Sequence, residues 1–155
     1  MRIGFSVNGA SVEVEARADE SLLHVLRREL GLLSVRETCG IGVCGACTVL
    51  LDDEPVSGCL LLAPLARGRE ITTVEGLGGE HPVQRAFEEK HAFQCGYCTP
   101  GMVLTAKRLL EQNPRPTEQD VRLALAGNLC RCGCYVKLVD AVLSAAGREE
   151  DGWTS

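Results

Sequence analysis

Nine cysteines most constrain what this 155-residue chain can fold into. Eight of them fall into two separated sets, and the ninth, Cys134, stands beside the second set. Disulfide scaffolds are typical of secreted chains, whereas clustered thiols in a reducing compartment are typical of metal sites. Residues 1–10 lack the basic stretch and the apolar run of a secretory signal. We therefore predict metal-bound thiolates in a cytoplasmic protein.

The first set lies in a glycine-rich loop and its continuation. It consists of Cys39, Cys44, Cys47 and Cys59. The first three follow the spacing C-x4-C-x2-C, which is that of a plant-type [2Fe–2S] cluster with its fourth ligand elsewhere. Glycines permit the tight turns that point backbone N–H groups at the sulfurs. Zinc is the alternative, but zinc sites usually pair two short knuckles.

The second set consists of a CxxC pair, Cys95 and Cys98, and a CxC pair, Cys130 and Cys132. Thirty-one residues separate the two pairs. Each pair precedes a predicted helix, and helix N-termini favour thiolates and anionic clusters. Spacing alone leaves a second [2Fe–2S] cluster, a redox-active CxxC and a zinc site open.

The pattern of the chain changes near residue 75, which predicts an α+β protein of two domains, 1–75 and 80–147, with a tail at 148–155. Asn-Gly at 8–9 indicates a hairpin turn, and prolines mark helix boundaries in the second half. Strands are predicted over 2–7, 11–15, 48–51, 56–60 and 71–74, and a helix over 21–30. A linker is predicted over 75–79. Four helices are predicted after it: one over 82–90, one over 101–112, one that begins at 117, and one over 135–146.

Several function classes lack support. The net charge is −5 with scattered basic residues, and no apolar run could span a bilayer, so we expect neither a nucleic-acid surface nor a membrane span. No Ser–His–Asp pattern, phosphate loop or dinucleotide fingerprint is present, and we predict no catalytic residue. We interpret His24 and His81 as packing or surface residues. His91, four residues before Cys95, is the one histidine placed to tune a cluster.

Three strings, in order, carry a family resemblance. CGIGVCGACT from Cys39, QCGYCTPG from Gln94 and GNLCRC from Gly127 resemble the small iron–sulfur subunit of the molybdenum hydroxylases, the xanthine dehydrogenase and aldehyde oxidoreductase family. The resemblance runs from about residue 2 to residue 146. It implies a β-grasp ferredoxin-like domain followed by a four-helix-bundle domain, each holding one [2Fe–2S] cluster.

The same resemblance implies partners and a direction for the electrons. A large subunit would carry molybdopterin and oxidise the substrate, an N-heterocycle or an aldehyde. A medium subunit would carry FAD, in a heterotrimer or a dimer of heterotrimers. Gln94 and Cys132 occupy the positions that approach the pterin in the family. Electrons would pass from molybdenum to the second cluster, then to the ferredoxin-type cluster and the acceptor.

One departure from the family falls on the ninth cysteine. The family usually continues the CxC with Thr-Gly-Tyr, whereas this chain has Gly133-Cys134-Tyr135. We expect the glycine to be shifted by one position and Cys132 to remain the ligand. A competing ligand or a redox-active thiol at Cys134 is the alternative. A free-standing two-cluster ferredoxin and a zinc-stabilised binding module are the other two hypotheses for the whole chain. The tail residue Trp153 is expected to be disordered or to contact a partner.

Overall fold

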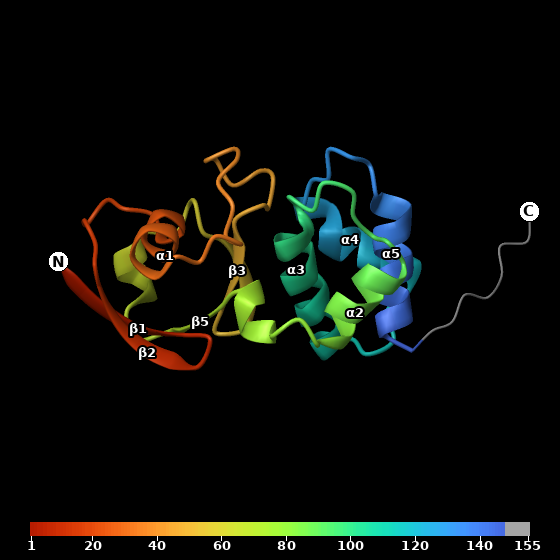
Figure 1. Ribbon diagram of the computed structural model, residues 1–155, viewed down its shortest axis with the longest axis horizontal. Coiled ribbons are helices and arrows are strands. Elements are labelled where there is room, and N and C mark those ends of the chain that lie inside the picture. Colours follow the sequence, from red (N-terminus) through yellow and green to blue (C-terminus); the bar gives the residue numbers. More distant parts are fainter. Residues whose placement is uncertain (148–155) are drawn as a thin grey trace, which may run out of the picture.

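A mixed five-stranded sheet forms the first half of the molecule in the computed structural model, which describes residues 1–147 (Figure 1). The strands lie in the order β2-β1-β5-β3-β4. β1 pairs in parallel with β5, and the other neighbours are antiparallel. The strands are β1 (Arg2–Val7), β2 (Ala10–Glu15), β3 (Thr48–Leu51), β4 (Glu54–Ser57) and β5 (Glu70–Thr72).

Two tight hairpins build the edges of this sheet. Asn8 and Gly9 both have positive φ, at 51° and 80°, so the predicted turn is present between β1 and β2. Asp52 and Asp53 also have positive φ, at 48° and 66°. This two-residue turn lets Glu54 pair with Leu51, so β4 starts earlier and ends earlier than the predicted strand over 56–60.

Helix α1 (Leu22–Leu30) packs against the sheet, as its apolar spacing predicts. The Ser21 side chain accepts a hydrogen bond from the His24 backbone, and Gly31 ends the helix in the left-handed region at φ 65°. Leu22 and Leu26 are fully buried beneath it, in one core with strand residues such as Ile3 and Val49.

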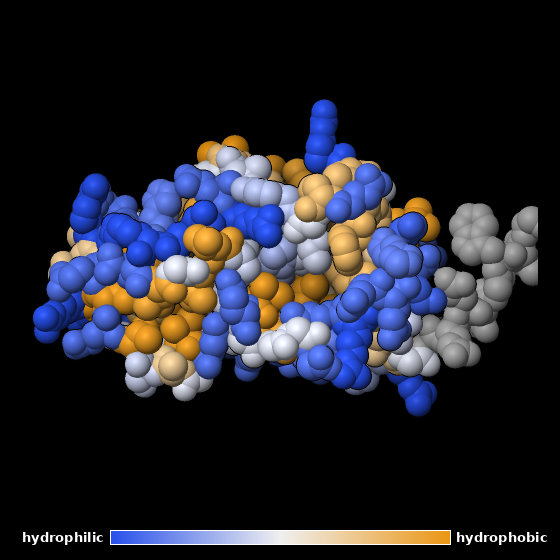
Figure 2. Space-filling model, in the orientation of Figure 1, coloured by the Kyte–Doolittle hydropathy of each residue, from blue (hydrophilic) through white to orange (hydrophobic). Residues whose placement is uncertain are grey.

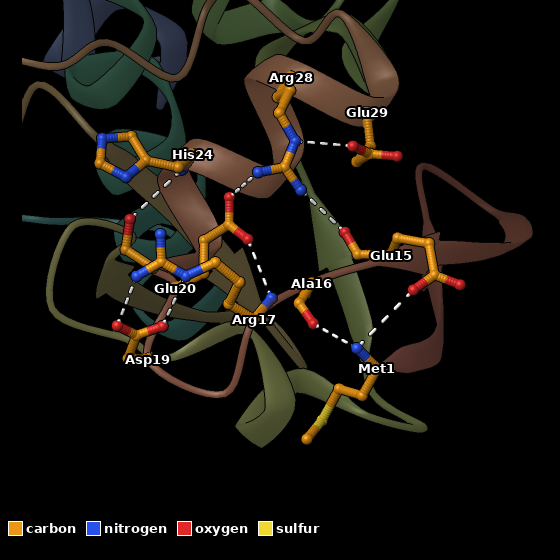
Figure 3. Close-up of polar contacts among 10 residues, drawn as sticks. Met1, Glu15, Ala16, Arg17, Asp19, Glu20, His24, Arg28 and Glu29 are labelled. Atoms are coloured by element: carbon orange, nitrogen blue, oxygen red, sulfur yellow. Dashed lines mark hydrogen bonds and ion pairs between the residues drawn. The ribbon is translucent and has the colours of Figure 1, made fainter.

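A buried carboxylate ties the start of α1 to the sheet edge (Figure 3). Glu20 accepts from the Arg17 backbone at 3.1 Å and pairs with the Arg28 guanidinium. Burial raises the pKa of Glu20, but these donors outweigh it and hold the pKa below its usual range. The same guanidinium donates to the Glu15 carbonyl at 2.9 Å, at the end of β2.

Helices form the second half, around a core of its own. They are α2 (Pro82–Glu89), α3 (Thr99–Gln112), α4 (Glu118–Ala124) and α5 (Tyr135–Ala145), with a short 3-10 turn η3 (Leu125–Gly127). His81 and Thr117 cap α2 and α4 through their side chains, each in a capping box. The α+β class is confirmed, whereas the four-helix-bundle description of the packing stays a prediction.

The segment between the halves is more structured than the predicted linker over 75–79. β5 ends at Thr72, because the Thr73 backbone donates to the Asn8 side chain at 2.9 Å, and the 3-10 helix η2 (Val74–Leu77) follows directly. Glu75 accepts a hydrogen bond from the Ser34 backbone at 3.1 Å. The last strand is therefore shorter than predicted, and the connection is fastened to the first half. Another 3-10 helix, η1 (Ala63–Ala66), lies between β4 and β5.

The two halves lie side by side, with α3 next to β3 (Figure 1). Arg108 on α3 pairs with Glu54 on β4, and the Tyr97 hydroxyl donates to the Glu37 carbonyl at 2.6 Å. Within residues 1–147, no helix has the length and apolarity needed to cross a bilayer. The boundaries at 75 and 80 stay a prediction, and the tail at 148–155, with Trp153, falls outside the described residues.

The Glu20 network predicts a pH-dependent loss of stability. Because the folded-state pKa of Glu20 is lowered, its contribution is present above the ordinary value of about 4.3 and disappears as the pH falls below it. Glu20→Gln should lower the free energy of unfolding by about 1–3 kcal/mol at neutral pH, since the buried side chain loses the charge that pairs with Arg28 and one of its two acceptor oxygens. The measurement is urea unfolding at several pH values. The exposed Glu88→Gln is the control, and equal effects from both variants would contradict the role of burial.

Candidate metal centres

The first cysteine set lies in the loop over 38–47 and just after β4. Gly40, Gly42 and Gly45 have positive φ, at 66°, 73° and 70°, so the loop makes three turns that other residues rarely adopt. These turns point N–H groups at Cys39, whose sulfur lies 3.4 Å from the Val43 nitrogen. Hydrogen bonds from Ile41, Cys44 and Val43 lower the Cys39 pKa to about 6. The loop thus stabilises a thiolate.

The thiols of the first set associate in two pairs. The Cys44 thiol lies close enough to Cys39 to lower its pKa, and the Cys59 thiol lies close enough to Cys47 to raise its pKa. The Cys59 backbone also donates to the Cys47 sulfur at 3.4 Å. Burial raises the Cys47 pKa to about 11, so a bound cation has to displace its proton.

The second set comes from two loops that precede helices. Cys98 is the N-cap of α3, and the Tyr97 backbone donates to the Cys95 sulfur at 3.4 Å, which lowers the Cys95 pKa. The Cys132 thiol lowers the pKa of Cys95, and the Cys130 thiol raises that of Cys98, so each pair of neighbouring thiols combines both loops. Burial raises the Cys98 pKa to about 12.

The ninth cysteine, Cys134, is buried at the N-cap of α5 and packs in the helical core. Burial, and then the neighbouring Cys130, raise the Cys134 pKa. Its side chain hydrogen-bonds Cys130, whereas Cys132 meets Cys95. Gly133 before it has φ 76°, consistent with a glycine shifted by one position to keep the turn.

One cavity of about 510 Å³ borders both sets. Its lining includes Cys44 from the first set and Cys95, Cys98 and Cys130 from the second. In Figure 1 the loops that carry the cysteines reach the same upper edge of the molecule. Figure 2 shows apolar surface at this edge of the first half, where the loop exposes Ile41 at 68% and Val43 at 56%.

This donor set fits iron–sulfur clusters. A [2Fe–2S] cluster takes four cysteines, two on each iron, and N–H groups directed at the sulfurs favour its negative charge. The first half provides four thiols in two pairs, and the second half provides the same arrangement with Cys134 as a fifth thiol beside Cys130. Each half also has an N–H group aimed at a sulfur. Within residues 1–147, no three Cys, His, Asp or Glu side chains converge on a single-ion position. Paired thiols do not require such a point, because each iron takes only two of them.

Comparison with known proteins agrees with this chemistry in both halves. Residues 5–72 match the family model described as a 2Fe-2S iron-sulfur cluster binding domain, and residues 73–143 match the [2Fe-2S] binding domain. One of the nicotinate dehydrogenase subunits of Pseudomonas putida is 48% identical, over 93% of this chain and 94% of its own. The nicotine 6-hydroxylase small subunit of Paenarthrobacter nicotinovorans is 47% identical, over 96% of this chain and 91% of its own. This chain is a small iron–sulfur subunit of the molybdenum hydroxylase family.

A solved structure agrees with the family in three dimensions. Quinoline 2-oxidoreductase from Pseudomonas putida 86 matches with a TM-score of 0.91 at 41% identity, over 95% of this chain and 94% of the matched one. As a molybdenum hydroxylase small subunit, the chain is a non-catalytic part of a multisubunit oxidoreductase and serves in electron transfer. Two [2Fe–2S] domains give it two clusters.

The remaining residues singled out from the sequence lie outside the cysteine pairs. Gln94 is exposed beside Cys95. His24 is exposed and lies 3.2 Å from a Glu37 carboxylate oxygen, and His81 caps α2, which agrees with their interpretation as surface and packing residues. His91 is exposed with φ 50° in the turn after α2, and a role in tuning a cluster remains only an alternative for it.

Several supporting contacts were not predicted from the sequence. The Cys130 backbone donates to the Tyr135 hydroxyl at 2.8 Å, which fixes the CxC loop to α5. The Leu129 backbone donates to the Cys44 carbonyl at 2.8 Å, which joins the two sets directly. The tyrosine of the family's Thr-Gly-Tyr string could have suggested the first contact. Nothing in the sequence indicates the second, because any residue supplies a backbone N–H.

The halves approach each other closely at a glycine. A Cβ added to Gly45 would lie 2.4 Å from the Gly127 carbonyl oxygen and 2.6 Å from the Asn128 amide nitrogen. A Cβ on Gly101 of α3 would lie 2.4 Å from the Gly45 carbonyl oxygen. Gly40 has a similar φ in the same loop but nothing within 4 Å of an added Cβ. Gly45 is thus required for both conformation and space.

Alanine substitutions at Gly40 and Gly45 should separate the cost of the left-handed backbone conformation from the cost of the missing space. Gly40→Ala should cost only the strain of a left-handed residue, about 1–2 kcal/mol. Gly45→Ala should cost that amount and a further 1–3 kcal/mol or so, because the added methyl group clashes with backbone. Urea unfolding of the iron-containing protein measures the difference. Equal losses in the two variants would contradict the close contact.

Proposed function

We propose that this chain carries electrons from a molybdenum–pterin cofactor on a large partner subunit to FAD on a medium partner subunit. Two thiol sets that border one cavity, each with N–H groups directed at a sulfur, are the observation that carries the proposal. The bound clusters supply one-electron chemistry. The chain itself binds them, keeps them near each other and excludes water from the inner thiols.

We assign the ligands by the thiol pairs. Cys39, Cys44, Cys47 and Cys59 would hold the ferredoxin-type cluster, and Cys95, Cys98, Cys130 and Cys132 the second. The Cys95–Cys132 contact supports Cys132 as the outer ligand of the CxC loop. Cys134 lies against Cys130 and is not a ligand in this assignment. Gln94 and Cys132 would face the pterin, which the exposure of Gln94 permits.

We propose an N-heterocycle as the substrate of the complex, bound on the large subunit. The names of the similar proteins support this choice over an aldehyde. Nicotinate and nicotine appear in the names of relatives at 48% and 47% identity, whereas aldehyde oxidoreductases of Desulfovibrio desulfuricans and Escherichia coli are 41% and 37% identical. The residues of this chain do not contact that substrate in the proposed arrangement.

The proposed assembly is a heterotrimer or a dimer of heterotrimers in the cytoplasm. Nine free cysteines fit a reducing compartment. Within the chain we propose a β-grasp domain over 1–75 and a four-helix bundle over 80–147. Their separate hydrophobic cores support this division.

Metal and flavin analysis of the native complex tests the function. Two [2Fe–2S] clusters require about four irons per copy of this chain, and we expect one molybdenum and one FAD with them. Iron without molybdenum in an intact preparation would favour a free-standing ferredoxin. Zinc in place of iron would contradict the cluster assignment.

Serine substitutions test the ligand assignment at the CxC loop. Cys132→Ser should remove the electron paramagnetic resonance signal of one cluster and about two irons per chain, because one ligand of that cluster is lost. Cys134→Ser, two residues away and also within the thiol cluster, should keep both signals. The reverse result would make Cys134 the ligand.

A further inference from the structure

We propose that Asn128 is a positioning residue that sets the relative placement of the two clusters. It belongs to no ligand set, and it stands two residues before Cys130, after the 3-10 turn η3. The inference rests on the proposed ligands, and it adds a role for a side chain that touches neither cluster. The argument comes from a hydrogen-bond network that crosses between the halves.

The Asn128 carboxamide donates hydrogen bonds to the first half of the molecule and accepts one from the second half. Its amide nitrogen donates to the Gly45 carbonyl at 3.1 Å and to the Thr48 hydroxyl at 3.3 Å. Its oxygen accepts from the Thr105 hydroxyl of α3 at 3.1 Å. The Thr48 hydroxyl in turn donates to the Gly45 carbonyl at 2.7 Å. The side chain therefore bridges the first cysteine loop and α3.

This network is buried, which raises the cost of breaking it. Asn128 is 5% exposed, and Thr48 and Thr105 are each 8% exposed. Among residues 1–147, only five polar or charged residues are buried, and three of them meet here. A buried polar group that loses its partner pays its full desolvation cost. An apolar side chain of equal volume would fill the space but would not define which backbone group lies opposite.

The Asn128 side chain aligns the segment before Cys130 with the loop that carries Cys44. Next along the backbone, Leu129 donates to the Cys44 carbonyl at 2.8 Å, and Cys130 follows. Cys44 and Cys130 are thus joined through one main-chain hydrogen bond that lies beside the Asn128 bridge. Gly45, the target of the amide, is the residue after Cys44. Loss of the amide removes the only buried side-chain bridge of the described residues that holds these two loops in register.

Electron transfer between two centres depends on their separation and mutual orientation. The thiols fix each cluster within its own half, but they do not fix one half against the other. Two other side-chain contacts between the halves lie at the surface: the ion pair of Arg108 with Glu54, and the hydrogen bond from the Tyr97 hydroxyl to the Glu37 carbonyl. Exposed pairs contribute little to a defined geometry. The buried carboxamide is therefore the side-chain contact that, together with the main-chain bond from Leu129 to Cys44, sets this geometry.

Paramagnetic resonance of the fully reduced, iron-containing full chain tests this role. Reduced wild type should show two spins per chain whose signals split each other, because the clusters lie close. Asn128→Leu should retain four irons and two spins but lose the wild-type splitting, and electrons should equilibrate between the clusters more slowly after flash reduction. Asn113→Leu is the matched control, since it makes the same substitution at a side chain whose hydrogen bonds, to Asp120 and from the Arg115 backbone, stay within the second half.

The outcomes separate this inference from the proposed function. A wild-type chain with fewer than two spins would refute the cluster assignment itself. Two spins in Asn128→Leu with unchanged splitting and rate would refute the role of Asn128, and so would an equal disturbance by Asn113→Leu. If Asn128→Leu fails to assemble both clusters, Thr48→Val decides by the same readouts, because it removes a single acceptor of the bridge.

Discussion

The close backbone contact between the cysteine loop and the helical half is the constraint on which the rest of the structure depends. Gly45 lies against the Gly127 carbonyl and Asn128, and Gly101 lies against the Gly45 carbonyl. Each half has a core of its own, so hydrophobic burial alone would leave them as two loosely joined bodies. The contact between main chains turns two binding sites into a single arrangement in which both thiol sets border one cavity.

Both halves solve the same electrostatic problem in different ways. Clustered thiolates repel one another and need nearby positive dipoles. In the first half a loop with three positive-φ glycines turns N–H groups toward Cys39. In the second half the thiols stand before helices α3 and α5, where backbone donors are unpaired. A loop needs glycines at fixed places for this purpose, whereas a helix supplies the donors by its geometry.

Much of the fold could be predicted from the sequence, because its signals are local. The Asn8-Gly9 turn, the helix after Ser21 and the capped helix after Thr117 follow from short-range chemistry. The end of β5 could not be predicted, since it depends on a long-range partner, the Asn8 side chain at Thr73. The cysteine spacing identified the candidate ligands. It could not reveal their pairing, or the Leu129–Cys44 hydrogen bond, which tertiary structure alone creates.

The contact at Gly45 also limits how this protein can be recombined. A ferredoxin module from another protein would bring the same cysteine spacing and a similar sheet. Its cysteine loop would also need a glycine at the position of Gly45, with a carbonyl oxygen that faces α3 and accepts the Asn128 hydrogen bond. The helical half would likewise need a glycine at 101 and an amide at 128. Exchange of either half therefore requires coordinated changes on both sides of the boundary, so the two modules are constrained to be inherited, and engineered, as a matched pair.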